Sequence, residues 1–213
     1  MSLVVRAFPC GPLQANCYVV HDPASGEGAI VDCGGRLDAI FAYVAKNDVS
    51  VRLIVATHAH FDHIFGFGYL RERYPSAKIY CHQADRQQWQ LNTQFAAQFG
   101  VPAPKNMLPE ADVYFDDSFT FKVGGFEFRT LHTPGHTPGS CCFLCAAQKI
   151  VFTGDTLFSC GVGRTDFIGG SPDAMRKSIA LLEKEVPGDY TVYPGHDTDE
   201  TAARALRSAR MMI

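Results

Sequence analysis

The 213-residue sequence has no excess of charge of either sign and no long apolar run. Its 19 Lys and Arg side chains are balanced by 22 Asp and Glu side chains, which leaves a formal net charge of -3. A chain without a broad positive field is poorly suited to bind phosphate backbones, so we expect no nucleic-acid partner. No segment reaches the roughly 18 to 20 apolar residues of a membrane span, and the N-terminal stretch has no charged leader with a long apolar core. We therefore expect a cytoplasmic protein without a membrane partner.

Low-complexity tracts and obvious linkers are also missing from the sequence. With 46% hydrophobic residues, the chain is long enough to bury a substantial core. We expect residues 1–213 to form a single domain. The sequence gives no indication of an oligomeric state.

Cysteine is present, but not in the context of a disulfide framework. The eight cysteines are at positions 10, 17, 33, 81, 141, 142, 145 and 160. Disulfide frameworks are typical of small secreted chains, and this sequence fits neither description. Cys142 and Cys145 form a C-x-x-C pattern inside the strand-like segment 140–146, where residues three apart point to opposite faces. We predict that this pair packs inside the protein and has no redox or metal role.

Short β-rich segments dominate both ends of the chain. The first three cover residues 3–8, 16–21 and 28–33, and Gly, Pro and Asp turn residues separate them. The later strand-like segments are VRLIVAT, SFTFKV, FEFRTL, CCFLCA, KIVFTG and YTVYP. Gly124 and Gly125 lie between SFTFKV and FEFRTL, where they predict a hairpin turn.

Helical patterns separate these strands. The sequence predicts helices over residues 36–48, from Asp62 to just before Pro75, over 173–186 and from about Asp199. Asp62 is suited to cap the second of these helices. Strand-rich halves that are each followed by helices predict two mixed β-sheets packed together with helices outside. This is a four-layer α/β sandwich.

The middle of the chain, residues 84–112, starts as a helix and becomes a connection interrupted by prolines. We expect it to form a lid or a flanking loop. Its Trp89, Phe95 and Phe99 are predicted to pack inside the protein, with the alternative that they line a substrate groove.

The segment THAHFDH, residues 57–63, places four metal-capable side chains directly after the apolar run LIV. His58 and His60 alternate in the loop, where alternate residues can turn both imidazoles to one side. Asp62 and His63 fall at the start of the next helix and form a second pair with a different direction.

Three more candidate ligands follow strands later in the chain. His136 comes after FEFRTL, Asp155 after KIVFTG and His196 after YTVYP. The backbone is expected to turn sharply at the glycine before each of them, namely Gly135, Gly154 and Gly195. Strand ends along one edge of a sheet sandwich converge on one rim, so all seven side chains are candidates for a single metal site.

These motifs carry a resemblance to a known family. The segments T-H-A-H-F-D-H, T-P-G-H-T-P-G-S, F-T-G-D-T-L-F and Y-P-G-H resemble the metallo-β-lactamase fold superfamily over nearly the whole chain. The resemblance implies an αβ/βα sandwich with two metals in a groove at the sheet edges. It assigns the first metal to His58, His60 and His136, the second to Asp62, His63 and His196, and the bridge between them to Asp155. Asp32, in IVDCGG, matches a further shared feature and is expected to fix a ligand loop by hydrogen bonding.

Donor chemistry agrees with two catalytic ions. Three protein donors and a shared carboxylate leave each ion one position for water. Imidazole and carboxylate donors suit zinc, with iron and manganese as alternatives, better than copper(I). Two ions ~3.5 to 4 Å apart can hold a hydroxide between them, because coordination lowers the pKa of water from about 15.7 to about 7. Asp155 would hold this bridging hydroxide, and Asp62 is a candidate for orienting it and for helping the leaving group to take its proton.

Asp155 separates this sequence from true β-lactamases, which resemble the pattern but lack the bridging aspartate at that position. The segment CGVGRTDFIGG, residues 160–170, resembles instead the glyoxalase II group, which hydrolyses hydroxyacyl thioesters of glutathione. The resemblance implies a thioester hydrolase. Its expected substrate is a small-molecule thioester, such as lactoyl-glutathione or an acyl thioester of another thiol.

Two departures from the glyoxalase II pattern bear on the substrate. Full-length members carry a C-terminal helical extension whose basic residues grip glutathione, whereas this sequence ends at residue 213, so we expect no separate glutathione-binding domain. Asp166 stands where a substrate-binding tyrosine is usual. Arg164 matches a basic substrate-binding position, and it either pairs with a substrate carboxylate or forms a salt bridge with Asp166.

A different reaction class stays open. Persulfide dioxygenases share the fold, the H-x-H-x-D-H motif and a similar GRTDF loop, and they use one iron. Two histidines and one carboxylate around iron leave room for oxygen and a sulfur substrate, and His58, His136 and Asp155 could supply them. Other hydrolases of the superfamily are a further alternative.

The remaining histidines lack such a context. His21 and His82 end strands without a glycine turn or partners, and His132 precedes the T-P-G-H segment. We predict structural roles for all three.

Overall fold

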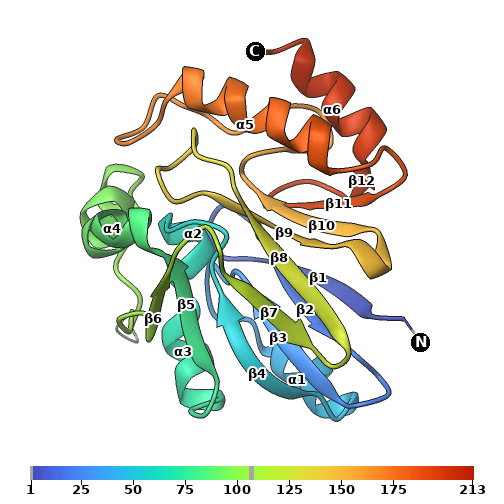
Figure 1. Cartoon of the computed structure of the whole chain (residues 1–213). Helices are drawn as coiled ribbons and strands as arrows, with labels where there is room; N and C mark the ends of the chain where they lie inside the picture. Colours follow the sequence, from blue (N-terminus) through green and yellow to red (C-terminus); the bar gives the residue numbers. More distant parts are fainter. Residues whose placement is uncertain (1, 106–107) are drawn as a thin grey trace.

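The computed structural model describes residues 2–105 and 108–213 and folds them into two six-stranded sheets (Figure 1). The first sheet contains, in spatial order, β1 Val4–Cys10, β2 Ala15–His21, β3 Glu27–Val31, β4 Ser50–Val55, β5 Lys78–His82 and β6 Val113–Phe115. The second contains β12 Glu200–Thr201, β11 Thr191–Pro194, β10 Ile150–Gly154, β9 Cys141–Cys145, β8 Phe126–His132 and β7 Thr120–Val123. Each sheet is thus built from one half of the sequence. Both are mixed, since β3 to β6 run parallel, as do β10 and β11, while the other neighbours are antiparallel.

Helices cover the outer face of each sheet (Figure 1). The first sheet packs against α1 Asp38–Lys46 and α3 Phe67–Arg73, and the second against α5 Pro172–Glu185 and α6 Ala202–Arg210. The short α2 Phe61–Ile64 contacts α4 Arg86–Gln98 beside the first sheet. The predicted four-layer sandwich is therefore confirmed. None of the helices in the described part of the chain combines the length and the apolarity that crossing a membrane requires.

The strands alternate between two apolar layers, as strands buried on both faces must. In β2, Val19 packs with the helices outside the first sheet, while its neighbour Val20 faces the second sheet. In β3, Ile30 and Val31 divide in the same way. This period of two fixes the register, because a slip of one residue would exchange the two faces.

The C-x-x-C pattern follows the same alternation in β9. Cys142 packs with the outer helices α5 and α6, and Cys145 faces the layer between the sheets. Both are buried free thiols. The prediction that they pack inside the protein is confirmed.

The predicted helix after the THAHFDH segment is divided in two. The break lies at Phe65 and Gly66, because the Gly66 amide donates to the Cys33 carbonyl at 2.7 Å and ties the chain to the loop after β3. A side chain at Gly66 would collide with the Cys33 sulfur atom. The prediction that Asp62 caps this helix is wrong: His60 precedes α2, and Asp62 lies in its first turn.

Two short strands were not predicted. β6 has three residues and β12 has two, too few to produce an alternating pattern. Because Glu200 and Thr201 pair with β11, the last helix begins at Ala202 and not at Asp199. β5, Lys78–His82, is predicted only through its last residue, His82, since its segment is not among the strand-like segments of the sequence. The remaining strands and helices lie where the sequence predicts them, and Val123 pairs with Phe126 across the predicted two-glycine hairpin turn.

The middle segment 84–112 begins with the end of a short 3-10 helix, Gln83–Asp85, followed by α4. Trp89 packs against Phe67 with ring centroids 5.8 Å apart, and its indole N–H donates to the Pro109 carbonyl at 3.2 Å. Its predicted packing role is confirmed. Residues 106 and 107 of the predicted lid or flanking loop lie outside the described residues.

Candidate metal centre

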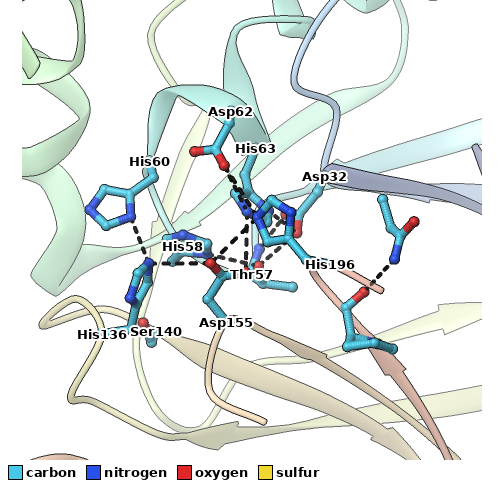
Figure 2. A network of polar contacts seen from close by, with 12 residues as sticks. Asp32, Thr57, His58, His60, Asp62, His63, His136, Ser140, Asp155 and His196 are labelled. Atoms are coloured by element: carbon cyan, nitrogen blue, oxygen red, sulfur yellow. Dashed lines mark hydrogen bonds and ion pairs between the residues drawn. The ribbon is translucent and has the colours of Figure 1, made fainter. Parts of the chain in front are cut away.

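All seven predicted ligands meet at one edge of the sandwich (Figure 2). The loop after β4 and helix α2 supply His58, His60, Asp62 and His63, and the loops after β8, β10 and β11 supply His136, Asp155 and His196. All of these side chains are buried except His196, which is half-buried. The convergence that the strand ends predict is present in the structure.

Donor atoms of three histidines form the first group, which is made of His58, His60 and His136. One nitrogen from each lies within 4.8 Å of the other two. The Nδ1 atom of His60 is 2.8 Å from Nε2 of His136. Three imidazoles that aim nitrogen atoms at one point are a typical donor set for zinc or iron.

The second group consists of Asp62, His63 and His196, whose donor atoms also lie within 4.8 Å of one another. Asp155 stands between the two groups. Its Oδ2 atom is 3.4 Å from Nε2 of His136 and 3.6 Å from Nε2 of His196. The single carboxylate can therefore reach both groups.

Four buried nitrogen or oxygen atoms of these ligands have no hydrogen-bond partner among the described residues. They are Nε2 of His58, Nε2 of His60, Nε2 of His63 and Oδ1 of Asp155. The last two lie 3.3 Å apart, and His60 turns its other ring nitrogen, Nδ1, toward His136. An unpaired buried polar atom costs about 1 to 3 kcal/mol. A cation placed between these atoms would remove that cost, so the residues fit divalent metal ions.

In three of the five histidines, His58, His63 and His136, the ring nitrogen Nδ1 has a polar partner of its own. Nδ1 of His136 donates to the Arg164 carbonyl at 2.7 Å, and Nδ1 of His63 donates to Asp32 at 2.9 Å. Nδ1 of His58 is 3.1 Å from the Thr57 hydroxyl. Such contacts fix the tautomer, so that each Nε2 lone pair is free to face a metal.

Burial and nearby charges shift the pKa values of histidines in the two donor groups in opposite directions. Burial lowers the pKa of His58 well below its usual range, and lowers that of His60 to about 3. Burial also opposes protonation of His63, but the carboxylates around it, Asp155 first, outweigh burial and raise its pKa well above the usual range. His58 and His60 of the first group are thus neutral imidazoles, whereas His63 of the second group is charged.

A glycine precedes each of the ligands His136, Asp155 and His196, and the structural reason for it differs between the three positions. Gly135 and Gly154 have φ angles of +146° and +48°, which residues with side chains rarely adopt. Gly195 is required by space, because a side chain there would collide with Asp155 and lie 2.8 Å from the His63 ring. The predicted backbone turn is therefore confirmed at Gly135 and Gly154, while at Gly195 close packing is the reason for glycine.

Asp85 holds two of the ligand loops together, a role for which the sequence contains no local signal. Its fully buried carboxylate accepts hydrogen bonds from the Ala59 amide at 2.8 Å, the Thr137 hydroxyl at 2.8 Å and the Gly139 amide at 2.5 Å. Ala59 lies between His58 and His60, and Thr137 follows His136. Burial raises the pKa of Asp85, and the three hydrogen bonds act against that shift.

A cavity of about 270 Å³ opens beside the donor cluster. Besides five of the ligand residues and Gly163, it is lined by Leu13, Phe61, Phe95, Phe99, Phe158, Arg164 and Phe167. The alternative prediction for Phe95 and Phe99, that they line a groove, is therefore confirmed.

Arg164 forms the predicted salt bridge with Asp166. The nitrogen to oxygen distances are 2.9 and 2.7 Å, and both side chains are largely exposed.

The three other histidines have partners of their own. His21 lies 3.1 Å from the Tyr43 hydroxyl. His82 and His132 both approach Asp117, with distances of 2.9 and 3.1 Å, and together these three residues also bring donor atoms within 4.8 Å. Because the Ala84 amide donates to Nδ1 of His82, its Nε2 carries the hydrogen that faces Asp117. This contact is explained by a hydrogen bond, in agreement with the predicted structural role.

Comparison with known proteins decides the family. The sequence profile described as "Metallo-beta-lactamase superfamily" matches residues 10–196. The chain belongs to the metallo-β-lactamase superfamily.

Relatives within this superfamily match nearly the full length of the chain. Hydroxyacylglutathione hydrolase GloC of Haemophilus influenzae is 30% identical, over 96% of this chain and 95% of its own. The probable metallo-hydrolase YqgX of Bacillus subtilis is 32% identical, over 90% of this chain and 89% of its own.

Solved structures from the superfamily agree with the fold. The BLEG-1 B3 metallo-beta-lactamase superimposes with a TM-score of 0.86 at 30% identity, covering 96% of this chain and 97% of that one. TTHA1623 in a di-iron-bound form has a TM-score of 0.84 at 30% identity and covers 97% and 99%. ETHE1 from Myxococcus xanthus has a TM-score of 0.76 at 28% identity and covers 96% and 82%.

Proposed function

We propose that this metallohydrolase is a binuclear thioester hydrolase of the glyoxalase II kind, which cleaves hydroxyacyl thioesters such as lactoyl-glutathione. The similarity to the hydroxyacylglutathione hydrolase GloC supports this class of substrate. We propose zinc as the metal, with iron and manganese as alternatives. The histidine and carboxylate donors suit all three ions.

The position of Asp155 is the observation that carries the proposal. Its Oδ2 atom lies 3.4 Å from His136 and 3.6 Å from His196, so one carboxylate stands within reach of both donor groups. A mononuclear iron enzyme of the dioxygenase kind would need only His58, His136 and Asp155. A complete second group of Asp62, His63 and His196 supports two ions.

The reaction would add water across the C–S bond of the thioester. The water oxygen forms a bond with the carbonyl carbon, the C–S bond breaks, and the products are a carboxylic acid and a free thiol. Two divalent ions bound here would polarise the carbonyl and lower the pKa of the attacking water to about 7.

The residues of the chain have separate tasks in this scheme. Asp32 and the Arg164 carbonyl hold His63 and His136 in the tautomer that presents Nε2 to the centre. Asp62 lies 3.3 Å from Nε2 of His196 at the edge of the cavity, where it can hold a proton for the departing thiolate. The proposed substrate-binding role of Arg164 requires its side chain to exchange Asp166 for a substrate carboxylate.

A second reaction has support from one neighbour. ETHE1 is similar in structure, and a mononuclear iron persulfide dioxygenase would use His58, His136 and Asp155. The similarity to BLEG-1, a metallo-beta-lactamase, makes a β-lactam a third substrate to test.

Metal analysis combined with product assays separates these functions. Protein loaded with zinc, iron or manganese is assayed for thiol release from lactoyl-glutathione, oxygen uptake with glutathione persulfide, and opening of a β-lactam. The proposal predicts close to two ions per chain and metal-dependent thiol release. One iron per chain together with oxygen uptake would replace it by the dioxygenase. The cytoplasmic location and the lack of nucleic-acid and membrane partners stay predictions.

A further inference from the structure

We propose that the acyl half of the substrate carries a large apolar group, such as an aryl or branched alkyl group, which binds beside the metal centre. This inference rests on the thioester hydrolase function proposed above and specifies the acyl group. The binding surface is the phenylalanine wall, defined as Phe61, Phe95, Phe99 and Phe167.

The phenylalanine wall is continuous. Phe95 and Phe99 have ring centroids 5.2 Å apart, and Phe167 lies 5.3 Å from Phe95 and 5.8 Å from Phe99. Phe61 lies 5.6 Å from Phe99. Four aromatic rings, each in contact with at least two of the others, therefore form one side of the cavity.

The phenylalanine wall directly adjoins the first donor group. The Phe95 ring stacks on the His60 ring with a centroid distance of 4.9 Å and an interplanar angle of 25°. Phe167 lies 6.2 Å from His136. A group that packs against these rings is thus close to the reacting carbonyl carbon, as a substituent of the acyl half would be.

The mouth of the cavity is apolar as well. Phe99 is 42% exposed and Leu13 is 45% exposed, although both are large hydrophobic side chains, and both line the cavity. Single exposed apolar residues are ordinary. Here they extend an apolar lining outward, which is typical of a site for an apolar ligand.

The described side chains that line the cavity offer no unpaired positive charge to an anionic group at this position. Arg164 is the single lysine or arginine among the described residues that line it, and its guanidinium is already paired with Asp166. The same guanidinium lies 4.3 Å from the centre of the Phe167 ring. The charged peptide of a glutathione thioester fits this lining poorly, so the acyl half is the part that fits it.

The volume is sufficient for such a group. The cavity measures about 270 Å³. A cavity of about 150 Å³ in another protein accommodates benzene. A phenyl group and the thioester carbonyl can therefore occupy the site together.

Two substrates that differ in one group test the inference. S-mandeloylglutathione and S-lactoylglutathione share the thiol and the α-hydroxyacyl unit, and differ by a phenyl in place of a methyl group. We expect kcat/KM to be higher for the mandeloyl thioester by about tenfold or more, because pocket contacts of this size give such ratios. The gain should lie mainly in KM, since the phenyl group is bound equally before and during the reaction.

Two alanine variants localise the effect. Phe99→Ala removes a ring at the mouth of the phenylalanine wall and should abolish most of the preference for the mandeloyl thioester. Ile168→Ala is the matched control, because Ile168 is 68% exposed and adjacent to Phe167 in the chain but does not belong to the residues that line the cavity. The Ile168 variant should keep the preference of the original chain.

The outcomes separate this inference from the proposed function. Equal or faster cleavage of the lactoyl thioester would overturn the apolar acyl group while the hydrolase function stands. If neither thioester is cleaved, the proposed function fails, and calorimetry with the product acids mandelate and lactate tests the apolar site. Tighter binding of mandelate than of lactate, with the difference lost in the Phe99→Ala variant, would support the apolar site. Equal binding of the two acids would overturn it.

Discussion

His63 donates a hydrogen bond from Nδ1 to the carboxylate of Asp32, at 2.9 Å. Asp32 also accepts from the Thr57 amide and the Thr57 hydroxyl, both at 2.7 Å. One buried carboxylate therefore orients a ligand of the second donor group and, through the Thr57 hydroxyl, a ligand of the first.

Replacing Asp32 by Asn should weaken metal binding without disturbing the backbone. Asp32 has a φ angle of +57°, which asparagine adopts readily. The new amide group would direct a donor toward His63 and favour the tautomer with hydrogen on Nε2, the atom that must face the metal. We expect a loss of about 10- to 100-fold in metal affinity, measured by titration with a competing chelator. Unchanged affinity would show that His63 needs no such orientation.

Asp85→Asn should destabilise the chain, because both carboxylate oxygens accept hydrogen bonds from backbone amides. The asparagine side chain has one accepting oxygen only. Its NH₂ group would face the backbone N–H of Ala59 or Gly139, so that two hydrogen-bond donors would meet without an acceptor. We expect a loss of about 1 to 3 kcal/mol in the free energy of unfolding, together with reduced metal content. Asp38→Asn is the control, since Asp38 is largely exposed and should tolerate the change. Equal stability of the two variants would contradict the role of Asp85.

Cation binding at the second donor group should release a proton. The carboxylates around His63 raise its pKa well above the usual range despite burial, so the metal-free ring is protonated at neutral pH. A cation must displace that proton, and its affinity should fall as the pH falls. His58 and His60, whose pKa values are lowered, are already neutral and should release none. Calorimetry in buffers of different ionisation enthalpy would detect proton release in one of the two cation-binding events. If neither event released a proton, the proposal that His63 binds a cation would be contradicted.

Much of this centre follows from the sequence, because the chemistry is concentrated in short segments. Histidines and aspartates that directly follow apolar strands are enough to predict His58, His136 and Asp155 as neighbours, and a glycine precedes the last two. Asp85 could not be predicted in the same way. Its hydrogen-bond donors lie 26, 52 and 54 residues away, and an aspartate before a helix is typical of a cap.

Contacts between residues far apart in the sequence also explain where the fold differs from the prediction. The alternating apolar pattern predicts the long strands. The short strands β6 and β12 form because they pair with the neighbouring strands β5 and β11. The break after α2 depends on a hydrogen bond from Gly66 to Cys33, a contact that sequence periodicity does not contain. Long-range contacts therefore decide the features that local patterns leave open.

Removing the metals should lower thermal stability. The unpaired nitrogens of His58 and His63 and the unpaired oxygen of Asp155 lose their cation when a chelator is added. Each ion present at 100 times its dissociation constant contributes about 2.7 kcal/mol, and one ion alone corresponds to about 5 to 10 °C in Tm for a chain of this size. Calorimetric scans with and without chelator measure this shift. Full recovery on adding zinc back is the control, and an unchanged Tm would contradict a metal centre.

Arg164→Ala should leave folding unchanged, because the salt bridge with Asp166 is exposed to solvent and screened. If Arg164 binds the substrate, KM should rise with little change in kcat. Asp166→Ala is the matched variant, since it removes the same salt bridge but frees the guanidinium. Equal KM values in both variants would show that Arg164 acts on the loop and not on the substrate.

Anomalous diffraction from zinc-loaded crystals tests the two-metal centre most directly. We expect two peaks ~3.5 to 4 Å apart, one beside His58, His60 and His136 and one beside Asp62, His63 and His196, with Asp155 in contact with both. In crystals of Asp155→Ala both peaks should weaken together. A single peak beside the first group, unchanged by the substitution, would contradict the shared carboxylate on which the proposed hydrolase depends.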